Sequence, residues 1–243
     1  MDVPETVKTA LADRPVEGAV CLDAGAGVGN TTAGLLDAGA RRVYAVTNDR
    51  EHAATVREGV GREHGERVLV TEADLRATPL PDDSVDVIAA HALLNVVTTS
   101  ALSEVAAELT RVAAPGAHLV VDDYDPVPGD AAVRDLFAVE NAAAALARGE
   151  PALTFYPAAM GRHLFAGYGW SFERERTLLS PVPWTESHVA AHADAAREAA
   201  ATLPPELGDP LRAETDRLAD AIGSESAGRM YSLAFRRPEQ EPR

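Results

Sequence analysis

One stretch near the N-terminus, Val20 to Asn30, constrains the fold more than any other. It reads VCLDAGAGVGN, so that an apolar run ends in Asp23 and is followed by glycines at alternate positions, Gly25, Gly27 and Gly29. The pattern predicts a buried strand, a tight turn and the start of a helix. Glycine is favoured in such a turn because a Cβ would obstruct the backbone angles or the close approach of a ligand. We therefore expect a ligand to lie against bare backbone here.

The spacing of these glycines separates two kinds of cofactor. Dinucleotide-binding turns follow the pattern G-x-G-x-x-G, whose third glycine comes five positions after the first. Counting from Gly25, that position is Asn30, which argues against a nicotinamide oxidoreductase. The sequence D-x-G-x-G-x-G instead resembles motif I of the class I methyltransferases that bind S-adenosylmethionine (SAM). The resemblance implies a SAM site that includes Asp23, Gly25, Ala26, Gly27 and Gly29.

A second part of the chain is similar to the same family in order and spacing. Asp74 and Leu75 precede a Pro-containing loop and the sequence DSVDVIAA, and the phrase ELTRVAAPGAHLVVDDYDP follows. This arrangement resembles the small-molecule methyltransferases related to ubiquinone and menaquinone C-methyltransferases, in detail over about residues 19–124. The resemblance implies that Asp74 accepts a hydrogen bond from the adenine amino group. It also implies that the Leu75 backbone meets the adenine ring.

The chain departs from the family pattern after its second predicted strand, Val43 to Val46. The family usually has an acid there that accepts both ribose hydroxyls, whereas this sequence has Thr47, Asn48 and Asp49. Either Thr47 and Asn48 make weaker hydrogen bonds to the ribose, or Asp49 reaches back to it. Asn48 followed three residues later by Glu51 also has the form of a capping box. We favour that capping role for Asn48, with cofactor contact as an addition.

Two residues at the ends of predicted strands are candidates for catalysis. His91 follows the apolar run Val85 to Ala90, and Tyr124 ends the next strand. Open α/β sheets bind ligands at the carboxyl ends of their strands, so we expect both residues at the mouth of the site. His91 would take a proton from a hydroxyl or an acidic carbon, or it would only line the cofactor. Tyr124 would either orient the methyl acceptor or only line the pocket.

The acidic pair Asp122 and Asp123, just before Tyr124, raises the question of a metal ion. Catechol-type metal sites also have an acid directly after the fourth strand, where this chain has His91, so we expect no metal. A single cysteine, Cys21, lies within the first predicted strand. It can form neither an internal disulfide nor a cysteine metal cluster.

Strands and helices alternate along the chain, which is typical of a three-layer α/β fold. The resemblance implies a Rossmann-like mixed sheet of seven strands with the last strand antiparallel. The 243 residues suit a single SAM-dependent methyltransferase domain, residues 1–243, whose core comprises about residues 16–180 and 228–237. A helical insertion on the substrate side, at about residues 184–223, precedes the last strand.

The insertion consists of two predicted helices. The first runs roughly from Thr185 to Ala201. The second has Asp209 and Pro210 in its N-cap and first-turn positions and ends at Gly223. We expect these helices to build the substrate pocket, together with an N-terminal helix and the segment from Phe155 to Tyr168.

The formal charge of −16, from 22 basic and 38 acidic residues, bears on partners and location. Nucleic-acid binding depends on Lys and Arg that neutralise phosphates, so we expect no nucleic-acid partner. An acidic surface fits a high-salt cytoplasm, where it stays hydrated and its self-repulsion is screened. The apolar runs are far shorter than the roughly 20 residues that span a bilayer, and the polar N-terminus has no secretory core. We therefore expect a cytoplasmic protein without a membrane span.

These features predict a SAM-dependent methyltransferase that acts on a small or medium organic molecule. A methyl group on a sulfonium is already activated, so the protein need only bind, align and desolvate the reactants, with a general base where the nucleophile is weak. The alternative is a catalytically silent subunit of the same fold that acts as a partner or scaffold, for which the missing acid at Thr47 is the hint. SAM affinity separates the two, because a silent subunit would bind SAM weakly or not at all.

Overall fold

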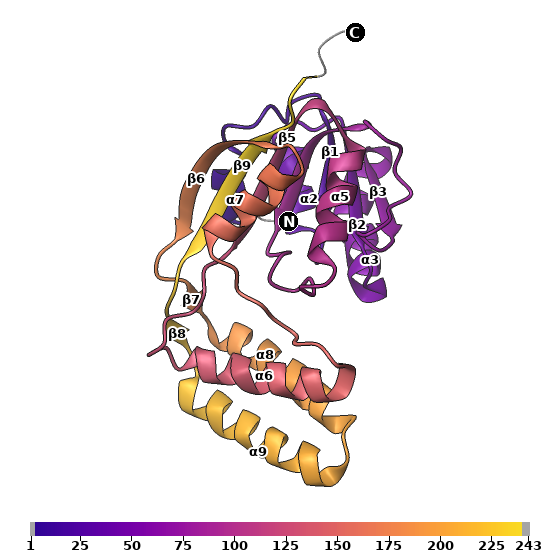
Figure 1. Cartoon of the computed structure of the whole chain (residues 1–243). Coiled ribbons are helices and arrows are strands. Elements are labelled where there is room, and N and C mark those ends of the chain that lie inside the picture. Colours follow the sequence, from indigo (N-terminus) through magenta and orange to yellow (C-terminus); the bar gives the residue numbers. More distant parts are fainter. Residues whose placement is uncertain (1–2, 240–243) are drawn as a thin grey trace.

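The computed structural model describes residues 3–239 as a β-sheet covered by helices, with a helical lobe attached at one edge of the sheet (Figure 1). The strands of the sheet are β1 (Val20–Ala24), β2 (Arg42–Thr47), β3 (Val68–Glu72), β4 (Val85–His91), β5 (Ala113–Tyr124), β6 (Ser171–Leu179) and β9 (Met230–Arg236). Their order across the sheet is β3-β2-β1-β4-β5-β9-β6. Strand β9 runs antiparallel to both of its neighbours, and the pairs from β3 to β5 are parallel. The predicted seven-stranded mixed sheet with an antiparallel last strand is confirmed.

Helices cover both faces of this sheet and complete the three predicted layers. One face packs against α1 (Glu5–Leu11) and α2 (Asn30–Asp37), and the other against α5 (Leu102–Val112) and α7 (Ala158–Gly167). Successive strand residues point to opposite faces, so Cys21 and Val87 join the first core while Leu22 and Ile88 join the second. Burial on both faces explains why the central strands β1 and β4 are mostly apolar.

The segment between β2 and β3 lies beside the edge of the sheet that these two strands form, and it is made of short helical pieces. Helix α3 (Arg50–Val56) continues into a π-helical segment, η1 (Arg57–Gly61), then α4 (Arg62–His64) and a 3₁₀ turn, η2 (Gly65–Arg67). Ala53, Val56 and Val60 are buried, and Val56 and Val60 lie next to Gly29 of the glycine turn. This segment therefore supports the β1–α2 turn from one side.

The helical lobe contains α6 (Val133–Arg148), α8 (Glu186–Ala201) and α9 (Pro205–Ile222), with the short strand pair β7 (Pro183–Trp184) and β8 (Glu225–Ser226). Helices α8 and α9 precede β9, as predicted for the insertion, and α6, which follows β5, packs against both of them. Phe137, Trp184, Ala193 and Leu218 are buried in the core of this lobe. No helix within residues 3–239 is both long and apolar enough to cross a membrane.

The start of α9 differs from the prediction, whereas α8 follows it. Helix α8 begins directly after Thr185, the predicted first residue, which is its N-cap and whose side chain accepts a hydrogen bond from the His188 amide. Helix α9 begins at Pro205 rather than at Asp209, and Pro210 lies inside it. Its first turn packs on the end of α8 so closely that a Cβ on Gly208 would lie 2.4 Å from the Ala200 oxygen. This tertiary contact extends the helix backwards past the position where local sequence favours its start.

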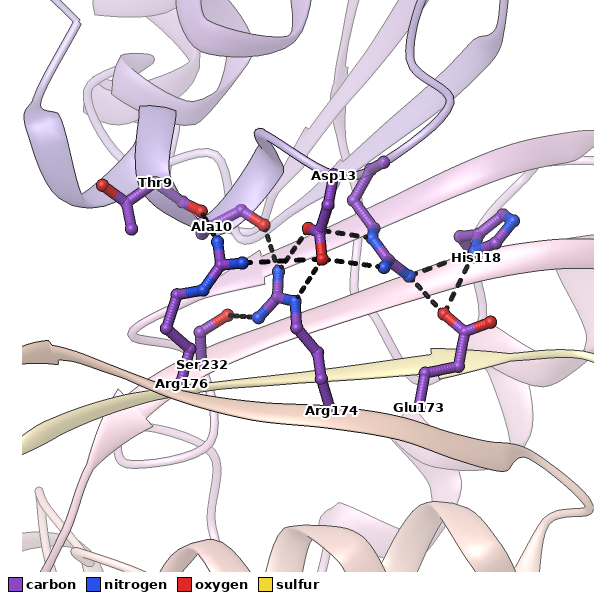
Figure 2. Close-up of polar contacts among 9 residues, drawn as sticks. Thr9, Ala10, Asp13, His118, Glu173, Arg174, Arg176 and Ser232 are labelled. Atoms are coloured by element: carbon purple, nitrogen blue, oxygen red, sulfur yellow. Dashed lines mark hydrogen bonds and ion pairs between the residues drawn. The ribbon is translucent and has the colours of Figure 1, made fainter.

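The N-terminal helix α1 is fastened to strand β6 by a set of polar contacts (Figure 2). Asp13, just beyond the helix, accepts hydrogen bonds from the Arg174 guanidinium at 2.8 and 2.9 Å. Arg174 also donates to the Ala10 carbonyl, and Arg176 donates to the Thr9 carbonyl at 2.6 Å. Carbonyl groups in the last turn of a helix have no partner within the helix, and here arginines from β6 supply one. The helix is thereby held across the face of the sheet.

Candidate active site

The site lies where the strand order reverses, at the carboxyl ends of β1 and β4. Strands β2 and β3 lie on one side of β1, and β4 and β5 lie on the other, so the order of the strands reverses between β1 and β4. Open α/β sheets bind ligands at such a point. Asp23 on β1 is paired with Ala89 on β4, two residues before His91, and His91 is paired with Asp122 on β5. Side chains at paired positions, and at positions two residues apart, point to the same face. The topology therefore brings Asp23, His91 and Asp122 together.

Gly27 is the glycine of the turn that borders open space. The φ angles of Gly25, Gly27 and Gly29 are +82°, +49° and +96°, in the region that residues with a Cβ rarely adopt. A Cβ on Gly25 would lie 2.9 Å from Leu93 Cδ1, and one on Gly29 would lie 3.3 Å from Val60. A Cβ on Gly27 would meet only the Gly25 oxygen, at 4.0 Å. The glycines at the two ends thus permit close packing, and the central one leaves bare backbone facing outwards.

Buried hydrogen bonds fix this turn from below. The backbone amides of Gly25 and Ala26 both donate to the Val46 oxygen at the end of β2, at 3.0 and 2.9 Å. Asp23 is 1% exposed, and its carboxylate accepts a hydrogen bond of 2.6 Å from the Thr32 hydroxyl in the first turn of α2. Burial raises the pKa of Asp23 to about 6, although the Thr32 hydrogen bond opposes this. Asp23 therefore joins β1 to the start of α2 beneath the turn.

The prediction that Asn48 caps the next helix is wrong. Asp49 is the N-cap of α3, and its Oδ1 accepts a hydrogen bond of 2.8 Å from the His52 amide. Strand β2 continues through Thr47, whose buried hydroxyl accepts a hydrogen bond of 3.2 Å from the Asp49 amide, so the helix begins one residue later than expected. Asn48 is exposed between these two residues. Of the three positions considered for the ribose, Asp49 carries an exposed carboxylate and Thr47 uses its hydroxyl to shape the turn.

The two residues expected at the adenine lie after β3, as the sequence indicates. Asp74 is partly exposed, and both of its carboxylate oxygens accept hydrogen bonds from Arg76, at 2.6 to 3.1 Å. These hydrogen bonds lower the pKa of Asp74, which keeps the carboxylate ionised. Leu75 is half-buried and packs against the core on the α5 side of the sheet. The Arg76 partner was not anticipated from the sequence.

The side chains of His91 and Asp122 contact each other at the ends of β4 and β5. The His91 Nδ1 atom lies 3.0 Å from Asp122 Oδ2, and the two side chains are 22% and 5% exposed. Burial alone would lower the pKa of His91, but the hydrogen bond and charge of Asp122, together with Asp23 and Asp123, outweigh it and raise the pKa. Because Nδ1 faces the carboxylate, Nε2 is the nitrogen left to meet a substrate.

The backbone next to His91 adopts a strained conformation. Ala92 has φ of +50°, and its backbone amide donates a hydrogen bond of 2.7 Å to the backbone carbonyl oxygen of Asp122. An L-residue in this region costs about 1–2 kcal/mol. The sharp turn ends β4 at His91 and sends the following residues, Leu93 to Val97, into a single helical turn over the site. His91 is thus held to Asp122 by side chain and backbone together.

Asp123 points to the opposite face of the sheet from Asp122 and supports the loop after β4. Its carboxylate accepts hydrogen bonds from the amides of Asn95 and Tyr124, at 3.1 and 2.8 Å, and burial raises its pKa to about 7. The backbone carbonyl of Asn95 in turn accepts a hydrogen bond of 2.8 Å from the amide of Thr154, which lies on the segment that returns from the helical lobe. In the described part of the chain no three potential metal-ligating side chains gather. The acidic pair therefore positions His91 and its loop.

Tyr124 lies where the sheet meets the helical lobe. Its ring packs at 5.3 Å from Trp184 and at 6.3 Å from Phe155, and Phe137 extends the same aromatic cluster. Burial, together with the charges of Asp123 and Asp122, raises the pKa of Tyr124 to about 12. The phenol therefore stays protonated at neutral pH and can donate a hydrogen bond, but it does not act as a base.

The sequence located most of these residues but missed their partners. It placed Asp23, Gly27, His91 and Tyr124 at one edge, and the structure brings all four to the carboxyl ends of the strands. It did not anticipate that Asp122 holds His91. A signal was present, because two residues that end adjacent parallel strands meet at the same edge. The packing of Leu93 on Gly25 carried no such signal, since it depends on the turn at Ala92.

Comparison with known proteins agrees with this architecture. Residues 22–121 match a family profile described as a methyltransferase domain. No curated protein matches the sequence significantly.

Solved structures share the fold over nearly the whole chain. The [4+2]-cyclase SpnF superposes with a TM-score of 0.65 at 17% identity, covering 96% of this chain and 80% of that one. The 1,6-didemethyltoxoflavin-N1-methyltransferase of Burkholderia thailandensis gives 0.60 at 14% identity, covering 97% and 79%. A geranyl diphosphate methyltransferase gives 0.61 at 16% identity, covering 95% and 84%. Residues 22–121 are thus similar to a methyltransferase domain, and the solved structures share the fold of the whole chain.

Proposed function

We propose that this protein transfers a methyl group from SAM to a small or medium organic molecule. The observation that carries the proposal is the turn from Gly25 to Gly29, where a left-handed Gly27 leaves open space at the carboxyl ends of β1 and β4. When bound, SAM supplies an electrophilic methyl group on a positively charged sulfur. The protein then has to hold and align two reactants and exclude water between them.

The residues around the turn fit such a cofactor. Asp49 offers an exposed carboxylate oxygen beyond the one that caps α3, which suits it to the ribose hydroxyls in place of the missing acid at Thr47. Asp74 and Leu75 are our candidates for the adenine contacts, with Arg76 fixing the carboxylate. Asp23 adds buried negative potential beneath the turn, which favours a cationic sulfur. The quinone-methyltransferase likeness remains a prediction about the subgroup.

The methyl acceptor would bind at the junction of the sheet and the helical lobe. Tyr124, Phe155 and Trp184 form an apolar wall there, and the Asn95–Thr154 hydrogen bond ties the loop after β4 to the lobe. Two of the structural neighbours are named for small acceptors, a toxoflavin precursor and geranyl diphosphate, which supports an acceptor of that size. An apolar wall with few polar groups is typical of a site for small organic molecules.

Ligand-induced stabilisation tests the cofactor site. SAM and S-adenosylhomocysteine should raise the melting temperature and NAD should not, because a ligand at 100 times its dissociation constant adds about 2.7 kcal/mol to the folded state. Gly27→Val should abolish the shift, since the side chain would occupy the space over the turn. Gly65→Val is the control, because Gly65 has φ of +56° against +49° for Gly27, and a Cβ there meets nothing within 4 Å, whereas one on Gly27 meets only the Gly25 oxygen at 4.0 Å. A Gly27→Val protein that still responds to SAM would contradict the proposal.

Methyl transfer itself is tested by incubating the protein with labelled SAM and an extract of its source, and identifying the labelled product by mass spectrometry. The expected result is a labelled small molecule whose formation requires the wild-type turn. The silent-subunit alternative predicts no label transfer and weak SAM binding or none. Strong SAM binding with no product in any extract fraction would reject methyl transfer while keeping the cofactor site.

A further inference from the structure

His91 and Asp122 are joined at two points, which makes their geometry rigid. The side chains meet through His91 Nδ1 and Asp122 Oδ2 at 3.0 Å. The backbone amide of the next residue, Ala92, donates a hydrogen bond of 2.7 Å to the backbone carbonyl of Asp122. The residues are also partners in the parallel register of β4 and β5. Rotation of the imidazole is therefore restrained, and its Nδ1–H is committed to the carboxylate. The lone pair of the neutral ring is then on Nε2, the form a general base requires.

The Asp122 carboxylate is not arranged for stability. Its second oxygen, Oδ1, is buried and has no hydrogen-bond partner within residues 3–239. A buried carboxylate oxygen without a donor costs free energy, so an ion pair kept only for stability would satisfy both oxygens. The pair between His192 and Glu140 in the helical lobe has a similar Nδ1–Oε2 distance of 2.8 Å, and neither Glu140 oxygen is among the unsatisfied buried atoms of the described chain. Asp122 Oδ1 thus differs from both Glu140 oxygens in being buried without a partner.

We propose that Asp122 is a positioning residue that orients His91 as the general base for a methyl acceptor. The reacting atom of this acceptor is a hydroxyl oxygen or an acidic carbon, which carries a dissociable proton. This inference rests on the proposed function. A hydroxyl is a weak nucleophile until its proton leaves, so such an acceptor gains most from a base held at the strand end. An imidazolium that forms beside a fixed carboxylate is stabilised, as in other His–Asp pairs.

The step balances with the groups named. The acceptor oxygen or carbon forms a bond to the methyl carbon and loses its bond to hydrogen. The sulfur–methyl bond breaks and leaves its electron pair on sulfur, which becomes neutral. The proton passes to His91 Nε2, while Nδ1 of the new imidazolium keeps its contact with Asp122. The proton later leaves His91 for water.

The charged groups that face His91 give the pH dependence its sign. Asp122 on β5 and Asp23 on β1 lie on the same face of the sheet as His91. Together with Asp123, whose side chain points to the other face, they raise the pKa of His91 against the effect of burial. The neutral imidazole, which is the base, therefore exists above this raised pKa, and the rate should increase with pH through it. Removal of the Asp122 charge should lower the pKa and weaken the base at the same time.

Asp122→Asn tests the inference, with Glu140→Gln as the matched control on the similar pair in the helical lobe. At saturating SAM, we expect label transfer to the extract acceptor to slow by about tenfold or more in Asp122→Asn, with SAM affinity within a few-fold of wild type. The acidic limb of its pH–rate profile should move to lower pH. Glu140→Gln should keep the wild-type profile. An unmoved limb in Asp122→Asn, or an equal change in both variants, would overturn the inference.

A second readout does not depend on turnover. NMR titration of the histidine rings in the presence of S-adenosylhomocysteine, with the His91 signal identified from His91→Asn, should show a lower His91 pKa in Asp122→Asn and a neutral ring protonated on Nδ1 in wild type. A His91 ring protonated on Nε2, or a pKa indifferent to Asp122, would overturn the inference while leaving the proposed function intact. Label transfer only to an amine nitrogen, with His91→Asn as active as wild type, would do the same. Absence of both SAM binding and label transfer would instead remove the proposed function and this inference with it.

Discussion

Asp23 illustrates, at the scale of a residue, how a site group lowers the stability of the fold. Burial raises its pKa from 3.8 to about 6, so the unfolded chain releases this proton at lower pH than the folded one. The protonated form therefore favours folding at acid pH, and this contribution is lost as pH rises from about 4 through about 6. A shift of about two units corresponds to about 3 kcal/mol above that range. The buried charge is retained at the strand end where ligands bind.

Asp23→Asn should therefore raise the free energy of unfolding relative to wild type at pH 8 and have little effect at pH 4, because Asn remains neutral and can still accept the Thr32 hydrogen bond. Urea denaturation at the two pH values measures the difference. Asp130→Asn, at an exposed position, controls for the general change in charge. An equal gain at both pH values would mean that ionisation of Asp23 is not its source. The same variant should bind SAM more weakly.

At the scale of elements, α1 is the helix whose position depends most visibly on polar contacts. Asp13 lies just past its end and links it to β6 through Arg174. Burial raises the pKa of Asp13, but the hydrogen bonds from Arg174 and Arg14 and their charges outweigh it and lower the pKa below its ordinary value. The stabilisation is thus present above the unfolded pKa near 3.8 and is lost as pH falls below it.

Asp13→Ala should loosen α1 without unfolding the sheet. We expect faster hydrogen exchange at the α1 amides, with the amides of β4 and β5 unchanged, because the helix loses its link to Arg174. Mass spectrometry of the exchanged peptides measures this. Asp194→Ala is the control, since Asp194 pairs with Arg197 at 2.7 Å on the surface of α8, where such pairs contribute little. Equal protection of α1 in Asp13→Ala and wild type would show that apolar packing alone holds the helix.

At the scale of the whole molecule, the sheet and the helical lobe are joined by four segments and carry a large net negative charge. The chain passes between them at residues 125–132, 149–157, 180–185 and 223–229. Arg229 on the last of these segments bonds Asp125 on the first at 2.6 Å, which fixes the junction next to Tyr124. The charge of −16 repels itself across both parts, and salt screens that repulsion.

Unfolding midpoints should therefore rise markedly between low and molar KCl, as the screening length falls from about 10 Å at 0.1 M to about 3 Å at 1 M. Calorimetry across a salt series measures the effect. A variant with four exposed acids changed to Gln should depend less on salt; these acids are Glu51, Glu58, Glu66 and Glu198. A flat profile for wild type, or the same slope for both proteins, would show that the acidity is not an adaptation to salt.

Features that depend on neighbours in the chain were determined by the sequence itself. The strand, turn and helix around Asp23 need only an apolar run and glycines at fixed spacing, because the turn requires positive φ. The Thr185 cap of α8 and the strand alternation, with the three layers it implies, are local in the same sense. His91 could be placed at the binding edge because topology puts strand ends there. The identity of the acceptor is not among these features.

The tertiary structure decided features that the local sequence pattern did not indicate. The choice of Asp49 rather than Asn48 as the cap followed from β2 running on through Thr47, and the early start of α9 followed from Gly208 meeting the end of α8. The pairing of His91 with Asp122 spans 31 positions and depends on the register of two strands. Local sequence limits which conformations a residue prefers, but contacts across the fold select among preferences that differ by about 1 kcal/mol or less.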